Sequence, residues 1–113
     1  MWRDDAYLLD ILLYARKAVA MTQGVSWQDF AEDDVLQLAT QHALQIIGEA
    51  AGKLSKDCRL AHPEIPWDKI IGLRHRIVHD YPRIELPKIW AIIQSQLPRL
   101  IEDIAPLVKP EHE

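Results

Sequence analysis

One eleven-residue stretch, Ile71–Tyr81, carries most of the side chains that could do chemistry. It contains two arginines, two histidines and a tyrosine, namely Arg74, His75, Arg76, His79 and Tyr81. An imidazole titrating near neutrality can take a proton from a ribose 2′-hydroxyl or return one to a leaving 5′-oxygen. A guanidinium can hold a phosphate through two parallel donors and stabilise the charge that grows on it. These residues fit metal-free cleavage of an RNA phosphodiester, with Arg74 and His79 as the catalytic pair.

The helix that must position this pair is predicted between Pro66 and Asp80. Pro66 suits the first turn of a helix, where a missing N–H costs nothing. Pro82 disfavours the α conformation for the residue before it, so the helix should end near Asp80. His79 follows Arg74 by five positions, so on an α-helix the two side chains point about 140° apart around the helix axis. The pair can therefore converge only if the last turn unwinds or if a second copy of the chain contributes.

A structural alternative stays open for the same residues. His79 could simply cap the helix C-terminus while Arg74 pairs with Glu49. Tyr81 could cover the end of a helical bundle with its ring and keep its hydroxyl in water.

Three further motifs accompany Arg74-x4-His79-x-Tyr81. They are Leu9-Asp10-Ile11-Leu12, Ile46-Ile47-Gly48-Glu49-Ala50-Ala51 and Pro63-Glu64-Ile65-Pro66-Trp67. Together these residues resemble the HepT-like branch of the HEPN superfamily, over roughly residues 5 to 105. One position departs from the family pattern, because His75 stands where asparagine is usual.

The resemblance implies a metal-independent endoribonuclease toxin of a type II/VII-like toxin–antitoxin pair. It implies a homodimer whose paired motifs line a shared RNA-cutting groove, with tRNA as a family-level substrate and 2′,3′-cyclic phosphate and 5′-hydroxyl as product ends. It also implies that Tyr81 receives AMP groups from a partner nucleotidyltransferase antitoxin, which would block the site by charge and bulk. No cofactor and no metal are implied.

Four residues are expected to support the catalytic pair. His75 could contact phosphate or orient Arg74 or His79, and Arg76 adds positive charge beside them. Asp10 and Glu49 belong to helices that should face the motif helix, where they could hold Arg74 or Arg76 in place.

Two other functions are compatible with the same residues. The chain could be a non-catalytic, nucleotide- or phosphate-binding partner subunit of a nucleotidyltransferase, or a purely structural dimer. A zinc site is a further alternative, since Cys58-x3-His62 and His75-x3-His79 supply four ligand-type side chains. A second cysteine beside Cys58 and a His-Glu-x-x-His motif are both missing, which argues against zinc.

Composition and charge limit the class of protein. The 113 residues predict one domain spanning 1–113, and the single cysteine excludes an internal disulfide and fits a reducing compartment. We found no signal-peptide pattern and no apolar run long enough for a membrane span, so we expect a cytoplasmic protein without a membrane partner. The net charge is −4, yet the segment from Lys53 to Lys88 has eight Lys and Arg against five Asp and Glu, which permits a local phosphate site.

Hydrophobic periodicity predicts an all-α, HEPN-like, up-down bundle of four main helices plus a short one. The main helices are expected near residues 4–22, 32–54, 66–80 and 86–107, the last kinked or divided at Pro98, and Ser26 should cap the short helix. The first helix is apolar nearly all round, which indicates burial on two sides, one of them against a second subunit. His42 is placed on a core stripe, and residues 56–65 are expected to form a polar connection.

Overall fold

The computed structural model describes residues 2–80 and 85–108, and every regular element in these ranges is helical. In chain order the elements are α1 (Trp2–Met21), α2 (Trp27–Ala31), α3 (Asp34–Lys53), α4 (Lys56–Ala61), α5 (Trp67–Asp80), α6 (Leu86–Ala91), a π-helical turn (Ile92–Gln96), α7 (Leu97–Ile104) and a 3₁₀ turn (Ala105–Leu107). The predicted all-α bundle is confirmed. In the described ranges no helix is long and apolar enough to cross a membrane.

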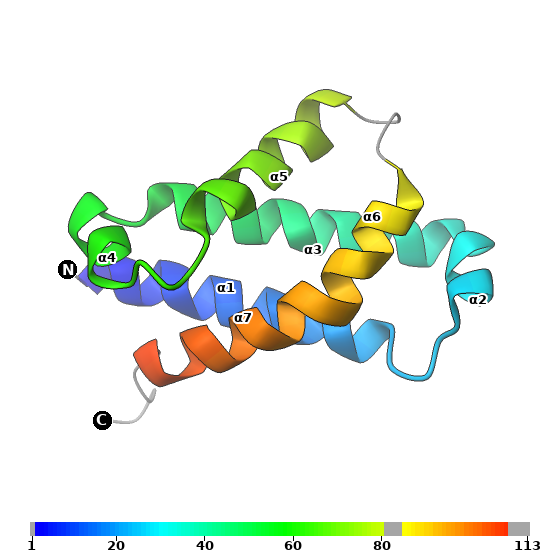
Figure 1. The fold of residues 1–113 in the computed structure, drawn as a ribbon, viewed down its shortest axis with the longest axis horizontal. Coiled ribbons are helices and arrows are strands. Elements are labelled where there is room, and N and C mark those ends of the chain that lie inside the picture. Colours follow the sequence, from blue (N-terminus) through cyan, green and yellow to red (C-terminus); the bar gives the residue numbers. More distant parts are fainter. Residues whose placement is uncertain (1, 81–84, 109–113) are drawn as a thin grey trace.

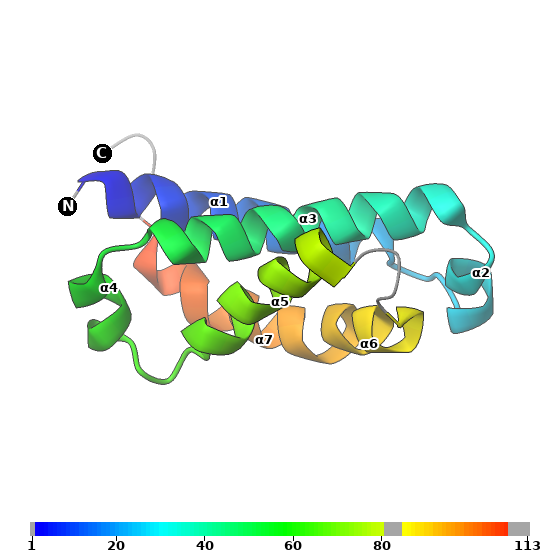
Figure 2. The ribbon, with the colours of Figure 1, turned by 90° about the horizontal axis from the view of Figure 1, so that it is seen from above.

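The long helices α1 and α3 run antiparallel, side by side, along the longest axis of the molecule (Figure 1). Viewed from above, α5 and the continuous α6–α7 segment both lie on one side of this pair (Figure 2). The core fills the space between the layers, where Ile11, Ile47 and Ile104 are each at most 2% exposed. Burying such a side chain contributes about 1.5–3 kcal/mol to folding.

The apolar surface of α1 is largely covered within its own chain. This helix packs against α3 on one side and against α7 on another, so two-sided burial does not need a second subunit. The apolar character of α1 is therefore not evidence for a dimer, because α7 packs along this helix and supplies the second contact. The homodimer itself stays a prediction.

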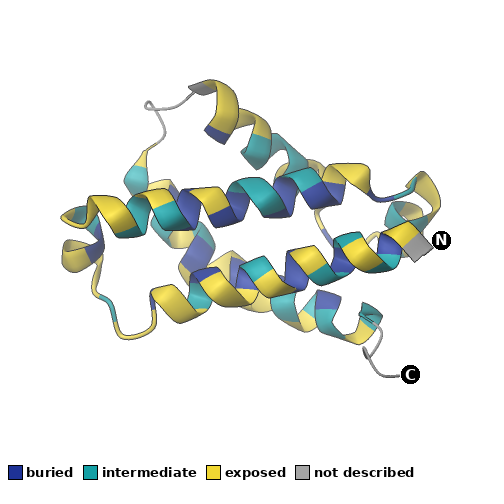
Figure 3. Ribbon diagram, turned by 180° about the vertical axis from the view of Figure 1, so that it is seen from behind, coloured by how far each residue is buried: buried dark blue, intermediate teal, exposed yellow. Residues whose placement is uncertain are grey.

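The prediction that His42 is an interior residue is wrong, because α3 has apolar residues on two faces. The inner face buries Leu44 and Ile47, which are each 2% exposed. The outer face leaves Val35 77% and Leu38 55% exposed, and His42 lies exposed on that face with them. Figure 3 shows the exposed positions recurring along α3 on the side away from α5 and α7.

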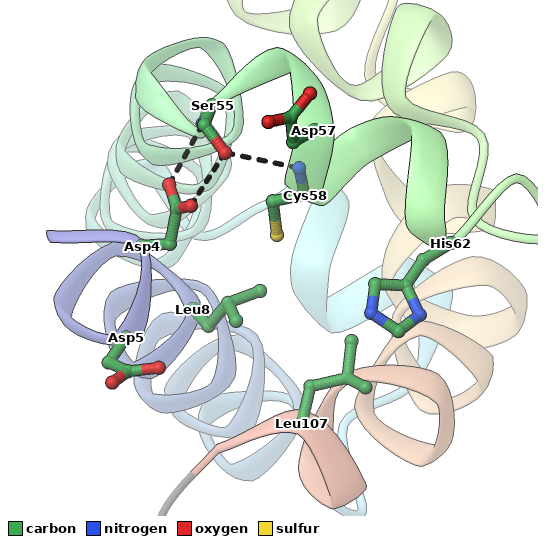
Figure 4. A pocket seen from close by; sticks show the side chains of 8 residues that line it. All are labelled: Asp4, Asp5, Leu8, Ser55, Asp57, Cys58, His62 and Leu107. Carbon is green, nitrogen blue, oxygen red and sulfur yellow. Dashed lines mark hydrogen bonds between the residues drawn. The ribbon is translucent and has the colours of Figure 1, made fainter. Parts of the chain in front are cut away.

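Residues 56–65, expected to be a connection, begin instead with the short helix α4. Ser55 caps this helix, since its Oγ accepts from the Cys58 N–H at 3.1 Å. Ser55 also donates twice to Asp4 at the start of α1, from its N–H at 2.8 Å and from its Oγ at 2.6 Å (Figure 4). These hydrogen bonds, the side-chain one first, lower the pKa of the Asp4 carboxyl, and they tie the chain's first helix to its fourth.

The predicted division of the last helix is confirmed: a π-helical turn at Ile92–Gln96 interrupts it just before Pro98. Pro98 has no N–H, and its ring would clash with a carbonyl one turn earlier if the helix continued regularly. The chain instead forms one wide turn, closed by a bond from the Leu97 N–H to the Ile92 carbonyl, and α7 starts after it.

The crossing of α5 over α3 depends on the small size of Gly48. A methyl group added at Gly48 would overlap the Cβ of Arg74 and come within 3.0 Å of the Ile70 carbonyl oxygen. Gly48 itself is buried. The position of the motif helix is thus set by the absence of a side chain at one point on α3.

Replacing Gly48 by alanine should push α5 away from α3 and lower the free energy of unfolding by about 1–3 kcal/mol, the range for overpacked cores. The matched control is Gly52→Ala in the same helix, where an added Cβ meets no described atom within 4 Å beyond its own helix turn. This control should raise stability by up to about 1 kcal/mol through helix propensity. Urea denaturation followed by circular dichroism measures both, and equal effects would contradict the role of Gly48.

Candidate active site

Arg74 lies on the side of α5 that faces α3 and is half-buried there. Its Nη2 donates to the Glu49 Oε1 at 3.4 Å, which is the pairing that the structural alternative predicted. Its Nε is buried and has no hydrogen-bond partner among the described residues. An unpaired buried donor is uncommon and needs a reason, such as a ligand that completes it. Glu49 therefore uses only part of the donor capacity of this guanidinium.

Glu49 is itself held by its own helix. The side-chain amide of Gln45 donates to the Glu49 Oε1 at 3.2 Å, and this bond is the main cause that lowers the pKa of the carboxyl. Arg74 lowers it further, while partial burial acts in the opposite direction. Because the carboxylate is ionised near neutral pH, it can orient Arg74 as a charged partner. Sequence reasoning missed Gln45, although its spacing of four residues from Glu49 on one helix could have revealed it.

His75 and His79 form a second group on α5, and this group is exposed. Their rings pack together with centroids 4.2 Å apart and an interplanar angle of 45°, and both residues are exposed. The spacing of four residues on a helix brings them together. Two exposed imidazoles in contact can exchange protons with bound substrate and with water.

Arg74 and His79 are not brought together within one chain. The helix α5 continues through Asp80, so the last described turn is not unwound in the way that convergence would require. On a regular helix the two side chains diverge by about 140°. A common site of Arg74 and His79 would therefore need a second copy of the chain.

The remaining predicted site residues lie in different surroundings. Arg76 is exposed on the rim of a groove between α5 and α7. Asp10 is exposed on α1, and α3 lies between that helix and α5 (Figure 1). Within the described residues no hydrogen bond or ion pair joins Asp10 to either arginine, so its supporting role stays a prediction. Tyr81 lies outside the described residues, as do residues 82–84.

Cys58 and His62 line a pocket together with residues at the start of α1 (Figure 4). They precede α5 in the chain, whereas His79 lies in the last turn of that helix. Burial, followed by the nearby Asp4 carboxylate, raises the pKa of the Cys58 thiol, which disfavours the thiolate that zinc binding needs. In the part of the chain that the structure describes, no three His, Cys, Asp or Glu side chains are grouped to hold a metal ion. The four ligand-type residues of the zinc alternative are therefore not assembled.

Comparison with known proteins gives a consistent family. The model of the family described as "Ribonuclease HepT-like" matches residues 11–107. "Putative RNase TTE0752" of Caldanaerobacter subterraneus subsp. tengcongensis is 33% identical over 105 residues, which span 93% of this chain and 94% of that relative. "Probable ribonuclease HepT" of Thermococcus cleftensis is 32% identical over 94 residues, covering 83% and 86% of the two chains. "Putative RNase MJ1380" of Methanocaldococcus jannaschii is 30% identical over 99 residues, covering 88% and 91%. No solved structure matches the chain.

Proposed function

The chain belongs to the ribonuclease HepT-like family of RNA-cleaving enzymes, and from this premise we propose that it is a metal-independent endoribonuclease toxin acting as a homodimer. The observation that carries the dimeric site is the divergence of Arg74 and His79 on a regular helix. One chain offers a phosphate-binding arginine on one side of α5 and an exposed imidazole on another.

The proposed reaction is transfer of the phosphodiester to the neighbouring 2′-oxygen. That oxygen forms a bond to phosphorus as its proton passes to one His79. The bond from phosphorus to the 5′-oxygen breaks, and the second His79 of the dimer supplies the proton that this oxygen needs. The products are a 2′,3′-cyclic phosphate and a 5′-hydroxyl, and no oxidant, reductant or metal enters the balance. One histidine cannot act as general acid and general base in the same step, so the reaction needs one His79 from each of two copies.

Arg74 is proposed to bind the non-bridging phosphate oxygens. Its Nε is unpaired among the described residues, and Glu49 occupies only Nη2. A guanidinium that is already oriented by one carboxylate can stabilise charge developing on the phosphate without reorganising during the reaction. His75, in ring contact with His79, is proposed to support it by holding the imidazole and sharing its protons.

The outer face of α3 is the surface proposed to pair in the dimer. Val35, Leu38, His42, Gln45 and Glu49 follow one another at alternating steps of three and four residues, which places them on one stripe. The stripe starts with two exposed apolar side chains and ends at the carboxylate that holds Arg74. Packing this stripe against its two-fold mate would bury the apolar residues beside the arginine of each copy.

Control of the enzyme is proposed to act through Tyr81, two residues after His79. A nucleotidyltransferase antitoxin would transfer AMP from ATP to the tyrosine hydroxyl: the phenolic oxygen loses its proton and bonds to the α-phosphorus of ATP as pyrophosphate leaves. The added phosphate would compete with substrate for the nearby arginines.

Replacing His79 by alanine should reduce RNA cleavage at least about 100-fold, because general acid–base catalysis contributes that much or more. Arg74→Ala should reduce it similarly, and excess EDTA should leave wild-type cleavage unchanged. His62→Ala, which changes a histidine outside α5, serves as the control and should retain activity. The assay is cleavage of purified tRNA with identification of the product ends, together with growth after expression of the chain alone. Harmless expression of wild type with nucleotide binding would instead indicate the non-catalytic partner subunit.

Replacing Leu38 by glutamate should convert the dimer to monomer and abolish cleavage while the fold is retained. A charge at this position would be desolvated in the proposed interface, where it lacks a partner. Leu60→Glu is the matched control, since Leu60 is 66% exposed on α4 and lies outside the stripe. Light scattering coupled to size-exclusion chromatography measures the mass, and a dimer unaffected by Leu38→Glu would place the interface elsewhere.

Replacing Tyr81 by phenylalanine should preserve RNA cleavage and remove neutralisation by the antitoxin, because only the acceptor hydroxyl is lost. Intact-mass measurement of wild type co-expressed with its nucleotidyltransferase should show added adenylyl groups that the variant lacks. Equal neutralisation of both proteins would exclude this tyrosine as the acceptor.

A further inference from the structure

A groove of about 750 Å³ separates α5 from the π-helical turn and α7. It arises because α5 packs mainly on α3, whereas α7 packs mainly on α1, so the two helices diverge (Figures 1 and 2). Its lining includes apolar side chains from three helices, namely Leu44, Ile47, Ile70, Leu73, Leu97 and Leu100. The volume is within the range of small-molecule sites and is too small for a second helix along its length.

The rim of the groove is basic and polar. Lys69, Arg76 and Arg99 contribute three cations, and within the described residues none is in ion-pair distance of a carboxylate. Two carboxylates, of Glu64 and Asp103, also reach the rim, so one positive charge remains in excess. The π-helical turn adds the side chains of Ser95 and Gln96, which can donate to or accept from a polar ring edge.

Gly72 lines this groove from the middle of α5, and the fold does not explain why it is glycine. Its φ is not positive, and beyond its own helix turn no described heavy atom lies within 4 Å of the place where a Cβ would be. Glycine inside a helix costs about 1 kcal/mol relative to alanine. The opposite holds at Gly48, where packing demands glycine. The missing side chain at Gly72 leaves space in the groove instead.

The groove is continuous with the proposed active site along one face of α5. Gly72, Arg76 and His79 are spaced four and three residues apart, so they follow one another on that face. Arg76 thus lies on the groove rim and also next to the proposed catalytic imidazole. A strand held at His79 would extend over Arg76 toward the apolar lining.

We propose that this groove binds one unpaired nucleotide of the RNA substrate, next to the phosphate that is cleaved. The base would lie on the aliphatic lining beside Gly72, and its phosphates would contact the cations of the rim. Unstacked bases are what proteins read in single-stranded RNA, and such a pocket can accept only a base that is already unpaired. The assignment rests on the proposed ribonuclease function and specifies its substrate as a loop, bulge or end of RNA.

Gly72→Leu tests the groove because its Cβ would meet no atom within 4 Å outside its own helix turn and its side chain would occupy groove space. Gly52→Leu is the matched control at a helix position where the Cβ is equally free and which lies outside the groove. The probe is a short, single-stranded, mixed-sequence RNA with 2′-O-methyl riboses and a fluorescein label, which cannot be cleaved through the 2′-oxygen. Fluorescence anisotropy should show Kd raised about tenfold or more by Gly72→Leu and essentially unchanged by Gly52→Leu, where tenfold corresponds to about 1.4 kcal/mol. Thermal unfolding checks that both variants fold, and Arg99→Glu provides a second variant on the opposite wall that should also weaken binding.

The outcomes separate this assignment from the general function. If wild type binds and cleaves RNA while Gly72→Leu and Gly52→Leu bind the probe equally, the nucleotide site is overturned and the ribonuclease function stands. If Gly72→Leu changes the mass of the protein in solution and leaves RNA binding intact, the groove is a protein interface and the proposal is likewise overturned. If wild type binds no RNA, both proposals fail together.

Discussion

The contact between Gly48 on α3 and Arg74 on α5 determines the geometry on which the rest of the candidate site depends. Because no side chain separates the helices at this point, the backbone of α5 approaches α3 closely enough for Arg74 to reach Glu49. The same closeness makes Arg74 half-buried, which strengthens its interaction with a carboxylate or a phosphate relative to full exposure in water. The orientation and partial desolvation of Arg74, the proposed catalytic arginine, thus follow from a single missing Cβ.

Most of the fold was predictable from periodicity and local capping chemistry. Ser26 caps α2 by accepting from the Asp29 N–H at 3.1 Å, and Asp33 caps α3 by accepting from the Leu36 N–H at 2.9 Å. These are interactions within one turn, so residue types alone encode them. The division of the last helix at Pro98 was predictable for the same reason, whereas the wide π-helical form was not. Proline excludes a regular hydrogen-bonded turn before it but does not specify which irregular turn replaces that one.

The sequence-based predictions that were wrong concern which face of a helix is buried and which helices are neighbours. Both depend on residues that are distant in sequence. His42 falls at a spacing that fits the core stripe of α3, yet the neighbouring helices cover the other face and leave it exposed. Asp10 was expected near the motif helix, and the order of helices places α3 between them. The helix α4 was missed because it has no buried residue of its own, and its stability comes from the Ser55 cap and the bond to Asp4. The Arg74–Glu49 pair was foreseen both as an alternative to catalysis and as support for it, and the observed ion pair is compatible with either role.

The two glycines nearest the motif show why one residue type can have opposite physical roles. At Gly48 the missing side chain allows two helices to touch, and any replacement must displace the backbone of α5. At Gly72 the missing side chain leaves the groove between α5 and α7 open, and the Cβ of a replacement would meet open space. The first glycine lowers the energy of the folded chain, whereas the second raises it relative to alanine. A cost to folding that brings no packing contact is best understood as the consequence of a ligand's volume, and the excess of one positive charge on the groove rim favours the anionic ligand that we propose.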